Sequence, residues 1–202
     1  MFSVFIFFIF NTTLAATELT LSEIKRIYSE INDMKGNFIQ KNYMKDMKKT
    51  EVYRGNFVVK MPSKMKWHYT GGNDETDVII KGTDMIIYQE KLKQALRQRF
   101  DPELYGQTPV ALLSGLGNID SDFAIEERQG NLILKPKRSM RGIISIELKP
   151  SEGQFPIDSL IITDKRSNRI EIRLMDVNIN TGAPDSLFEF SPPKGVRLQE
   201  LQ

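Results

Sequence analysis

Near its start, the chain changes from a helical to a strand-like spacing of hydrophobic residues. Residues 20–23 have the composition of a capping box, in which the side chains of Thr20 and Glu23 accept hydrogen bonds from each other's backbone N–H groups. The apolar residues of this segment lie three or four positions apart, with charged residues between them: Leu21, Ile24, Ile27, Tyr28 and Ile31. This spacing predicts one amphipathic helix that ends at Gly36.

From residue 37 onward, apolar and polar residues alternate in short runs, which is typical of half-buried β-strands. The predicted strands are residues 37–43, 51–61, 64–69, 78–81, 85–89, 96–100, 123–127, 132–135, 142–148, 159–163, 170–175 and a last short one at 188–190. Between two of these runs, Thr108 and Pro109 begin a very apolar stretch that predicts a second, short helix ending at Gly115.

This order of elements predicts a mainly β domain that spans residues 17–202. It contains about ten or eleven strands and two helices without β-α-β alternation, so the sheet should be antiparallel. Twist accumulates over so many strands, and the sheet must therefore curl. Two helices are too few to cover a flat sheet of this area. We expect an open, unclosed antiparallel β-barrel whose helices lie as a lid over its mouth.

The first sixteen residues have the pattern of a signal peptide. The apolar run at residues 2–10 is far shorter than the roughly 20 residues that span a bilayer, but it suits a signal-peptide core. Small residues follow at Thr13, Ala15 and Ala16, which predicts cleavage near Ala15 or Ala16 and export of the mature protein. No Lys or Arg precedes the apolar run, and the alternative is a buried N-terminal strand.

Composition leaves few residues for catalysis or metal binding. The chain has no cysteine and one histidine, His68, which excludes disulfides, thiolate metal sites and a cysteine nucleophile. Its 28 Lys and Arg against 26 Asp and Glu are too balanced for a dedicated nucleic-acid binder. It also lacks a Gly-x-Ser-x-Gly elbow and a phosphate-binding loop. We therefore expect no enzyme activity, metal or cofactor, and a surface or packing role for His68.

Although basic and acidic residues are nearly equal in number, three groups of basic residues stand out along the chain. They are Lys45, Lys48 and Lys49; Lys60, Lys64 and Lys66; and Lys135, Lys137, Arg138 and Arg141. The simplest interpretation is solvated surface. The alternative is a docking patch for acidic partners or lipid headgroups.

Several short motifs occur in an order and spacing that resemble the LolA family, the periplasmic outer-membrane lipoprotein carrier proteins. The resemblance covers about residues 21–198. The motifs are Gly36-Asn-Phe38-Ile-Gln40, Gly55-Asn-Phe57-Val-Val-Lys60 followed by Pro62 and Trp67, Gly82-Thr-Asp-Met-Ile-Ile-Tyr88, Thr108-Pro109, Ile162-Thr-Asp-Lys165 and Phe188-Glu-Phe-Ser-Pro-Pro-Lys-Gly-Val196.

The resemblance implies an open β-barrel with an apolar cavity under a helical lid. It further implies a monomeric periplasmic carrier that receives lipoproteins, bound by their acyl chains, from an inner-membrane ABC transporter. The carrier then delivers them to a receptor lipoprotein on the outer membrane. A receptor of this family would need a lipidated cysteine, which this chain lacks, so the carrier is the better match. The alternative is a periplasmic binding or sensing domain for another amphiphile, such as a glycolipid or phospholipid.

Strand alternation and the resemblance together predict which residues line the acyl-chain cavity. The strand positions share two faces that the resemblance places inward, and the helical positions come from the two predicted helices. The set comprises Ile24, Ile27, Ile31, Phe57, Val59, Met61, Met65, Trp67, Tyr69, Val110, Leu112 and Leu113. The alternative is that these residues form an ordinary core. Met61 departs from the family, which often has Arg there, and a Met side chain cannot tie the lid by donating a hydrogen bond.

Overall fold

A computed structural model describes residues 20–71, 75–100, 119–140, 142–151 and 153–201. Twelve strands within these residues form one sheet, with the order β12-β6-β5-β4-β3-β2-β1-β11-β10-β9-β8-β7. The elements are α1 (Leu21–Glu30), β1 (Asp33–Met44), β2 (Lys49–Lys60), β3 (Lys64–Thr70), β4 (Thr76–Lys81), β5 (Asp84–Gln89), β6 (Gln94–Arg99), α3 (Ile119–Asp122), β7 (Phe123–Arg128), β8 (Asn131–Pro136), β9 (Ile143–Pro150), β10 (Ile157–Asp164), β11 (Arg169–Ile179), η3 (Asp185–Phe188) and β12 (Arg197–Glu200).

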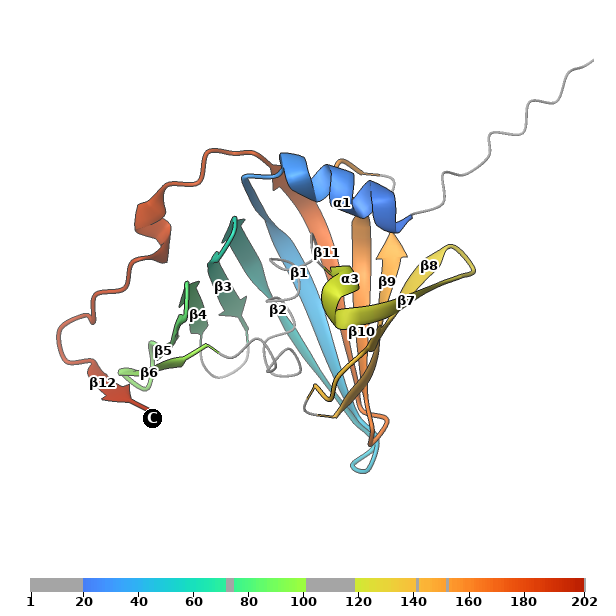
Figure 1. Cartoon of the computed structure of the whole chain (residues 1–202). Coiled ribbons are helices and arrows are strands. Elements are labelled where there is room, and N and C mark those ends of the chain that lie inside the picture. The colour runs from blue at the N-terminus through green and yellow to red at the C-terminus, as the bar shows by residue number, and fades with distance from the viewer. Residues whose placement is uncertain (1–19, 72–74, 101–118, 141, 152, 202) are drawn as a thin grey trace, which may run out of the picture.

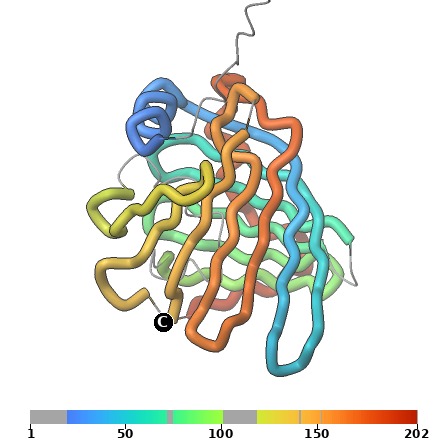
Figure 2. Tube along the Cα trace, turned by 90° about the vertical axis from the view of Figure 1, so that its right-hand side faces the viewer, coloured from blue at the N-terminus to red at the C-terminus, as the bar shows by residue number. Residues whose placement is uncertain are grey.

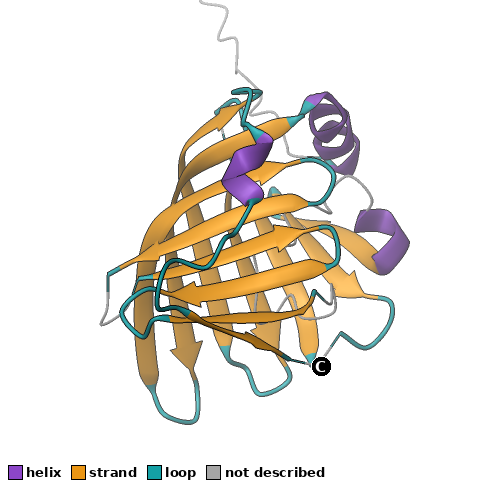
Figure 3. Ribbon diagram, turned by 90° about the vertical axis from the view of Figure 1, so that its left-hand side faces the viewer, coloured by secondary structure: helices purple, strands orange, loops and turns teal. Residues whose placement is uncertain are grey.

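The sheet is strongly curved and remains open, which confirms the predicted fold class (Figures 1 and 3). Its terminal strands, β12 and β7, are not hydrogen-bonded to each other in the described part of the chain. Neighbouring strands pair antiparallel, with one exception that the sequence did not predict: β12 pairs parallel with β6. No predicted strand corresponds to β12, which lies at the edge of the sheet.

The capping box at the start of α1 is present as predicted. The backbone N–H of Glu23 donates to Thr20 Oγ1 over 3.2 Å, and the Thr20 N–H donates to the Glu23 carboxylate over 3.3 Å. The predicted end of the helix at Gly36 is wrong, because α1 ends at Glu30 and Ile31 is already extended.

Gly36 lies inside β1 and is required there by close packing. A Cβ atom at this position would lie 2.9 Å from the carbonyl oxygen of Met175 and 3.1 Å from the ring of Phe57. The register between β1 and β11 shifts at the same point, between Lys35 and Asn37. Glycine inside a strand often marks such a close approach rather than a stop.

The predicted last strand at residues 188–190 is also wrong. Asp185–Phe188 forms the short 3₁₀-helix η3, and Phe188 is buried. The Asp185 carboxylate lies 2.7 Å from Lys60 Nζ and 2.8 Å from Lys64 Nζ. These ion pairs connect η3 to β2 and β3. The four-residue helix α3 was not predicted from the sequence, and the helix predicted after Pro109 lies outside the described residues.

The two faces of the sheet carry separate apolar clusters. The larger cluster joins α1 to the concave, inner face. The smaller one lies on the outer face of β4 to β6, where Phe190, Val196 and Leu198 pack over Ile79, Ile86 and Ala95. The C-terminal segment therefore covers the outside of the sheet and adds β12 to its edge.

Candidate functional site

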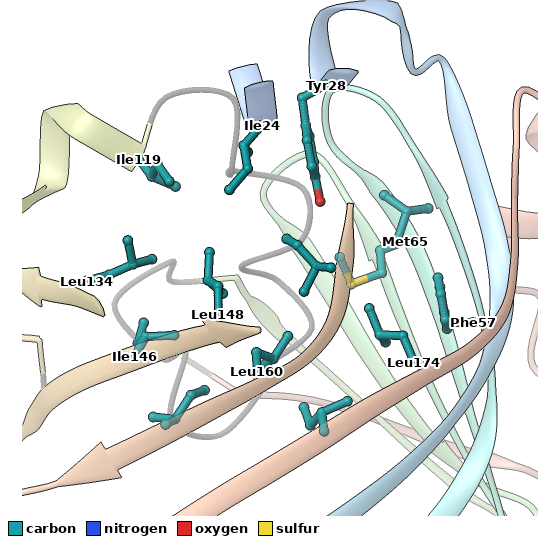
Figure 4. Packing of buried hydrophobic residues seen from close by; sticks show 14 of the residues in the cluster. Ile24, Tyr28, Phe57, Met65, Ile119, Leu134, Ile146, Leu148, Leu160 and Leu174 are labelled. Atoms are coloured by element: carbon teal, nitrogen blue, oxygen red, sulfur yellow. The ribbon is translucent and has the colours of Figure 1, made fainter. Parts of the chain in front are cut away.

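The inner face of the sheet is almost continuously apolar, and α1 packs across one end of it (Figures 1 and 4). Six of the predicted cavity residues are buried together in this cluster: Ile24, Ile31, Phe57, Val59, Met65 and Trp67. Ile27, Met61 and Tyr69 are partly buried and pack against it. Val110, Leu112 and Leu113 lie outside the described residues. Nine of the twelve residues thus share one apolar surface.

The opposite wall of this surface was missing from the sequence prediction. Inward side chains of β8 to β11 face α1 and β3 across the interior (Figure 4). They include Leu134, Ile146, Leu148, Leu160 and Leu174. Their alternation was visible in the sequence, but nothing in a strand pattern says which face turns inward. The curl of the sheet determines which face points inward, because it brings β8–β11 opposite β2 and β3.

Aromatic rings form the middle of the inner face. Trp67 stacks on Phe38, with ring centroids 4.2 Å apart, and on Phe57, with centroids 5.0 Å apart. Tyr69 meets Phe38 edge-to-face at 5.2 Å. Gly55 makes room for this group, because a Cβ there would lie 2.6 Å from the ring of Phe38, as well as 1.8 Å from the carbonyl oxygen of His68.

Toward the β1–β2 turn, the inner face becomes polar. The Tyr69 hydroxyl donates to Gln40 Oε1 over 3.2 Å, and Gln40 Nε2 donates to Asn42 Oδ1 over 2.9 Å. Burial raises the pKa of Tyr69, so its hydroxyl stays protonated. Beyond it, the Tyr53 hydroxyl donates to Glu51, and this hydrogen bond raises the pKa of Tyr53. The apolar part of the inner face therefore lies at the end covered by α1.

Helix α1 is held mainly by its apolar side. Ile24 is fully buried, and Tyr28 packs on Phe155 with ring centroids 5.7 Å apart. Two polar contacts supplement this packing. Lys25 pairs with Asp120 over 2.6 Å on the surface, and Asn180 Nδ2 donates to the carbonyl oxygen of Glu30 over 2.9 Å. Exposed ion pairs contribute little to stability, so apolar contacts dominate.

Met61 connects β2 to the segment that follows α1 through its backbone. Its backbone N–H donates to the carbonyl oxygen of Asn32 over 2.8 Å, directly after α1. Its side chain packs against the inner cluster. Asn32 is fixed in turn, because its N–H donates to Asn180 Oδ1 over 2.7 Å. Backbone hydrogen bonds and Asn180 therefore connect the end of α1 to the sheet.

His68 lies on the outer face and is not part of the inner cluster. Its Nδ1 is 2.6 Å from Asp77 Oδ1, and Lys66 Nζ is 3.1 Å from the other oxygen of the same carboxylate. Among the described residues, no group of three or more His, Cys, Asp or Glu could hold a metal ion. Within the same residues, no helix is long and apolar enough to cross a membrane.

The basic groups of the sequence have different surroundings. Lys60 and Lys64 pair with Asp185, and Arg138 pairs with Asp122. The turn that carries Lys45 and Lys48 lies beside the β10–β11 turn, because the Lys45 N–H donates to Asn168 Oδ1 over 3.0 Å. That second turn adds exposed basic residues, Lys165, Arg166 and Arg169. The two turns form a basic end of the molecule, opposite α1 (Figures 1 and 2).

An open β-sheet curled round an apolar inner face, with an amphipathic helix across one end, defines a class of fold that presents apolar surface on its inside. Comparison with known proteins gives the family. The chain belongs to the family described as outer membrane lipoprotein carrier protein LolA, which matches residues 29–191. The resemblance found in the sequence is thereby confirmed.

Curated relatives carry the same description. An outer-membrane lipoprotein carrier protein of Pseudomonas putida KT2440 is 28% identical over 191 residues, which cover 92% of this chain and 90% of the relative. One from Neisseria meningitidis serogroup C is 25% identical over 178 residues, covering 86% and 83%. Because these relatives are named as carriers, they support the prediction that the chain is not an enzyme.

Solved structures support the fold alone. A LolA superfamily protein from Nitrosomonas europaea superposes with a TM-score of 0.51 at 15% identity, covering 85% of this chain and 98% of that one. An uncharacterized conserved protein from Thermus thermophilus gives a TM-score of 0.55 at 8% identity, covering 89% and 98%.

Proposed function

We propose that this protein is a periplasmic carrier that binds the acyl chains of lipoproteins between α1 and the inner face of its sheet. The observation that carries the proposal is the single apolar cluster that joins α1 to inward residues from both walls of the curled sheet. Membership of the lipoprotein carrier family supports the choice of cargo. The inner surface then has two roles: it packs as a core without cargo and shelters acyl chains with it.

The energetics favour competition between helix and cargo. Burying an acyl chain contributes about 0.8 kcal/mol per CH₂. About 15 methylenes would then contribute on the order of 12 kcal/mol, an affinity near 1 nM that would slow release. If the chains displace contacts made by Ile24 and Tyr28 of α1, their net affinity falls. Loading and unloading can then be reversible without ATP hydrolysis in this protein.

The transport route follows from this role. Residues 1–16 act as a signal peptide, and cleavage near Ala15 or Ala16 leaves a single carrier domain at residues 17–202. The carrier, as a monomer, takes lipoproteins from an inner-membrane ABC transporter and passes them to a receptor lipoprotein on the outer membrane. Lipid transfer between two membranes requires this sheltering, because the chains cannot cross water exposed.

Photolabelling of the wild-type protein tests where the chains bind. A synthetic lipopeptide carries diazirines on its acyl chains, and mass spectrometry locates the labelled residues after illumination. We expect labels on inward residues such as Met65 and Leu174, and none on their outward neighbours Lys66 and Arg173. Excess unlabelled lipopeptide should abolish labelling, whereas the same peptide without acyl chains should not. Labelling mainly on the outer face would contradict the proposal.

The alternative ligand is another amphiphile, such as a phospholipid or glycolipid, because an apolar surface does not select a headgroup. Competition in the same assay separates the two. A lipoprotein carrier should bind the lipopeptide at least as tightly as a phospholipid or glycolipid with matched chains. Intact mass spectrometry of the protein purified from its native envelope then identifies the bound species.

A further inference from the structure

Tyr28 places a polar group in the apolar interior without a hydrogen-bond partner. The residue lies on α1 with 6% of its surface exposed, and its hydroxyl forms no hydrogen bond among the residues that the structure describes. Figure 4 shows this hydroxyl pointing away from α1 into the interior, on the side where Met65 lies. Buried polar groups are nearly always hydrogen-bonded, so an exception of this kind requires an explanation.

Two other tyrosines of the inner face show that the fold can supply partners for such hydroxyl groups. The Tyr53 hydroxyl donates to Glu51 over 2.7 Å, and the Tyr69 hydroxyl donates to Gln40 over 3.2 Å. Both lie toward the polar end of the inner face. Tyr28 instead lies at the apolar end, where its ring packs on Phe155. Burial also raises its pKa well above the usual value, so the hydroxyl remains a donor at any physiological pH.

Among the described residues, two buried nitrogen atoms also lack a hydrogen-bond partner, but they have different surroundings. Arg97 Nε belongs to a guanidinium whose Nη1 donates to Glu200 over 3.1 Å on the sheet edge. Trp67 Nε1 lies near the Tyr69 hydroxyl and opposes the burial that raises the pKa of Tyr69, although the two groups do not form a hydrogen bond of good geometry. Tyr28 is distinct because its one polar atom is directed into the interior from the helix that covers it.

We propose that the Tyr28 hydroxyl donates a hydrogen bond to an acyl carbonyl oxygen of the bound lipid. This inference rests on the proposed function and adds a polar contact to it. An ester or amide carbonyl is the first acceptor that a lipid offers where its apolar chain meets its headgroup. A donor on α1 would therefore fix how deeply the chains enter, and it would distinguish acyl chains from alkyl chains of equal length.

A matched pair of ligands tests this contact. One is a peptide whose N-terminal cysteine carries a dioctanoylglyceryl group. The other carries a di-O-octylglyceryl group, in which ether linkages replace the esters and the carbonyl oxygens are therefore absent. Calorimetric titration measures both affinities for the wild-type protein, Tyr28→Phe and the control Tyr88→Phe. Tyr88 lies on the outer face, where it packs on Phe190 at 5.3 Å.

We expect the wild-type protein to bind the ester peptide about 3- to 10-fold more tightly than the ether peptide. Tyr28→Phe should lose this preference by weakening ester binding alone, and Tyr88→Phe should retain it. Without ligand, Tyr28→Phe should melt at least about 2 °C above the wild-type protein, because it removes the unpaired buried hydroxyl.

The outcomes separate this inference from the proposed function. Equal binding of both peptides, unchanged in Tyr28→Phe, would overturn the role of Tyr28 and leave the carrier proposal intact. Failure of both peptides to bind the wild-type protein would contradict the proposed function itself, and with it this inference.

Discussion

At the scale of single residues, the buried carboxylate of Asp33 joins two distant parts of the chain. It is 3% exposed, and its carboxylate accepts hydrogen bonds from the N–H groups of Thr181, Gly182 and Ala183 and from the Thr181 hydroxyl, over 2.7–3.3 Å. Burial alone would raise the pKa of Asp33, but these donors together lower it. The residue therefore fixes the start of β1 to the chain that leaves β11.

We predict that Asp33→Asn lowers the free energy of unfolding by about 2–4 kcal/mol at pH 7, because the new amide N–H₂ faces donors that then lack an acceptor. Urea denaturation measures the change. Asp185→Asn is the control, since Asp185 is exposed and its loss should cost much less.

The pH dependence follows from the lowered pKa of Asp33. The unfolded chain binds this proton more readily, so the contribution of Asp33 to stability is present above about pH 4 and is lost as the pH falls through the folded pKa. Stability of the wild-type protein should therefore fall below about pH 4 more steeply than that of Asp33→Asn. Parallel curves for the two proteins would contradict this assignment.

At the scale of elements, the C-terminal segment covers surface that the sheet would otherwise expose. Val196 and Leu198 pack on the outer cluster, and β12 pairs with β6 over four residues. Without this segment, β6 would be an exposed edge strand beside an apolar patch. Such edges promote pairing between chains.

We expect a chain that ends at Pro193 to self-associate and to bind a hydrophobic dye more strongly than the full chain, because it lacks β12 and uncovers the outer cluster. Light scattering and dye fluorescence measure the two effects. A chain shortened only by Gln202 should behave like the full protein. If the chain ending at Pro193 also stays monomeric and binds no more dye, the segment does not have this covering role.

At the scale of the whole molecule, one sheet separates two apolar surfaces that are covered by different parts of the chain. The outer cluster is covered by the chain's own C-terminal segment. The inner face is covered by α1, a helix of ten residues. Isolated helices of this length are marginal in water, so α1 depends on packing against the sheet. A short helix held by apolar contacts is well suited to exchange those contacts for lipid.

A ligand that binds only the folded protein must raise its melting temperature. At a free concentration 100 times its Kd, an acylated peptide should add about 2.7 kcal/mol, or about 5–10 °C for a chain of this size. Scanning fluorimetry measures the shift, and the unacylated peptide should produce none. An acylated peptide that binds without raising the midpoint would indicate comparable binding to the unfolded chain.

Short-range patterns in the sequence determined the positions of α1 and of most strands, and the type of sheet. The capping box and helical spacing located α1, and alternation located eleven of the twelve strands of the described residues, because both depend on short-range periodicity. The large number of strands without β-α-β units predicted a curled, open and mostly antiparallel sheet. Alternation and family resemblance also placed Phe57, Val59, Met65 and Trp67 in one apolar surface.

Tertiary structure decided the features that join residues far apart in the chain. The donors to Asp33 come from about 150 residues away, and Gly36 and Gly55 are needed for contacts with other strands rather than for turns. Parallel pairing of β12 with β6 likewise depends on where the C-terminal segment crosses the sheet. Sequence periodicity gives each strand two faces, but only the curl of the assembled sheet determines which face meets α1.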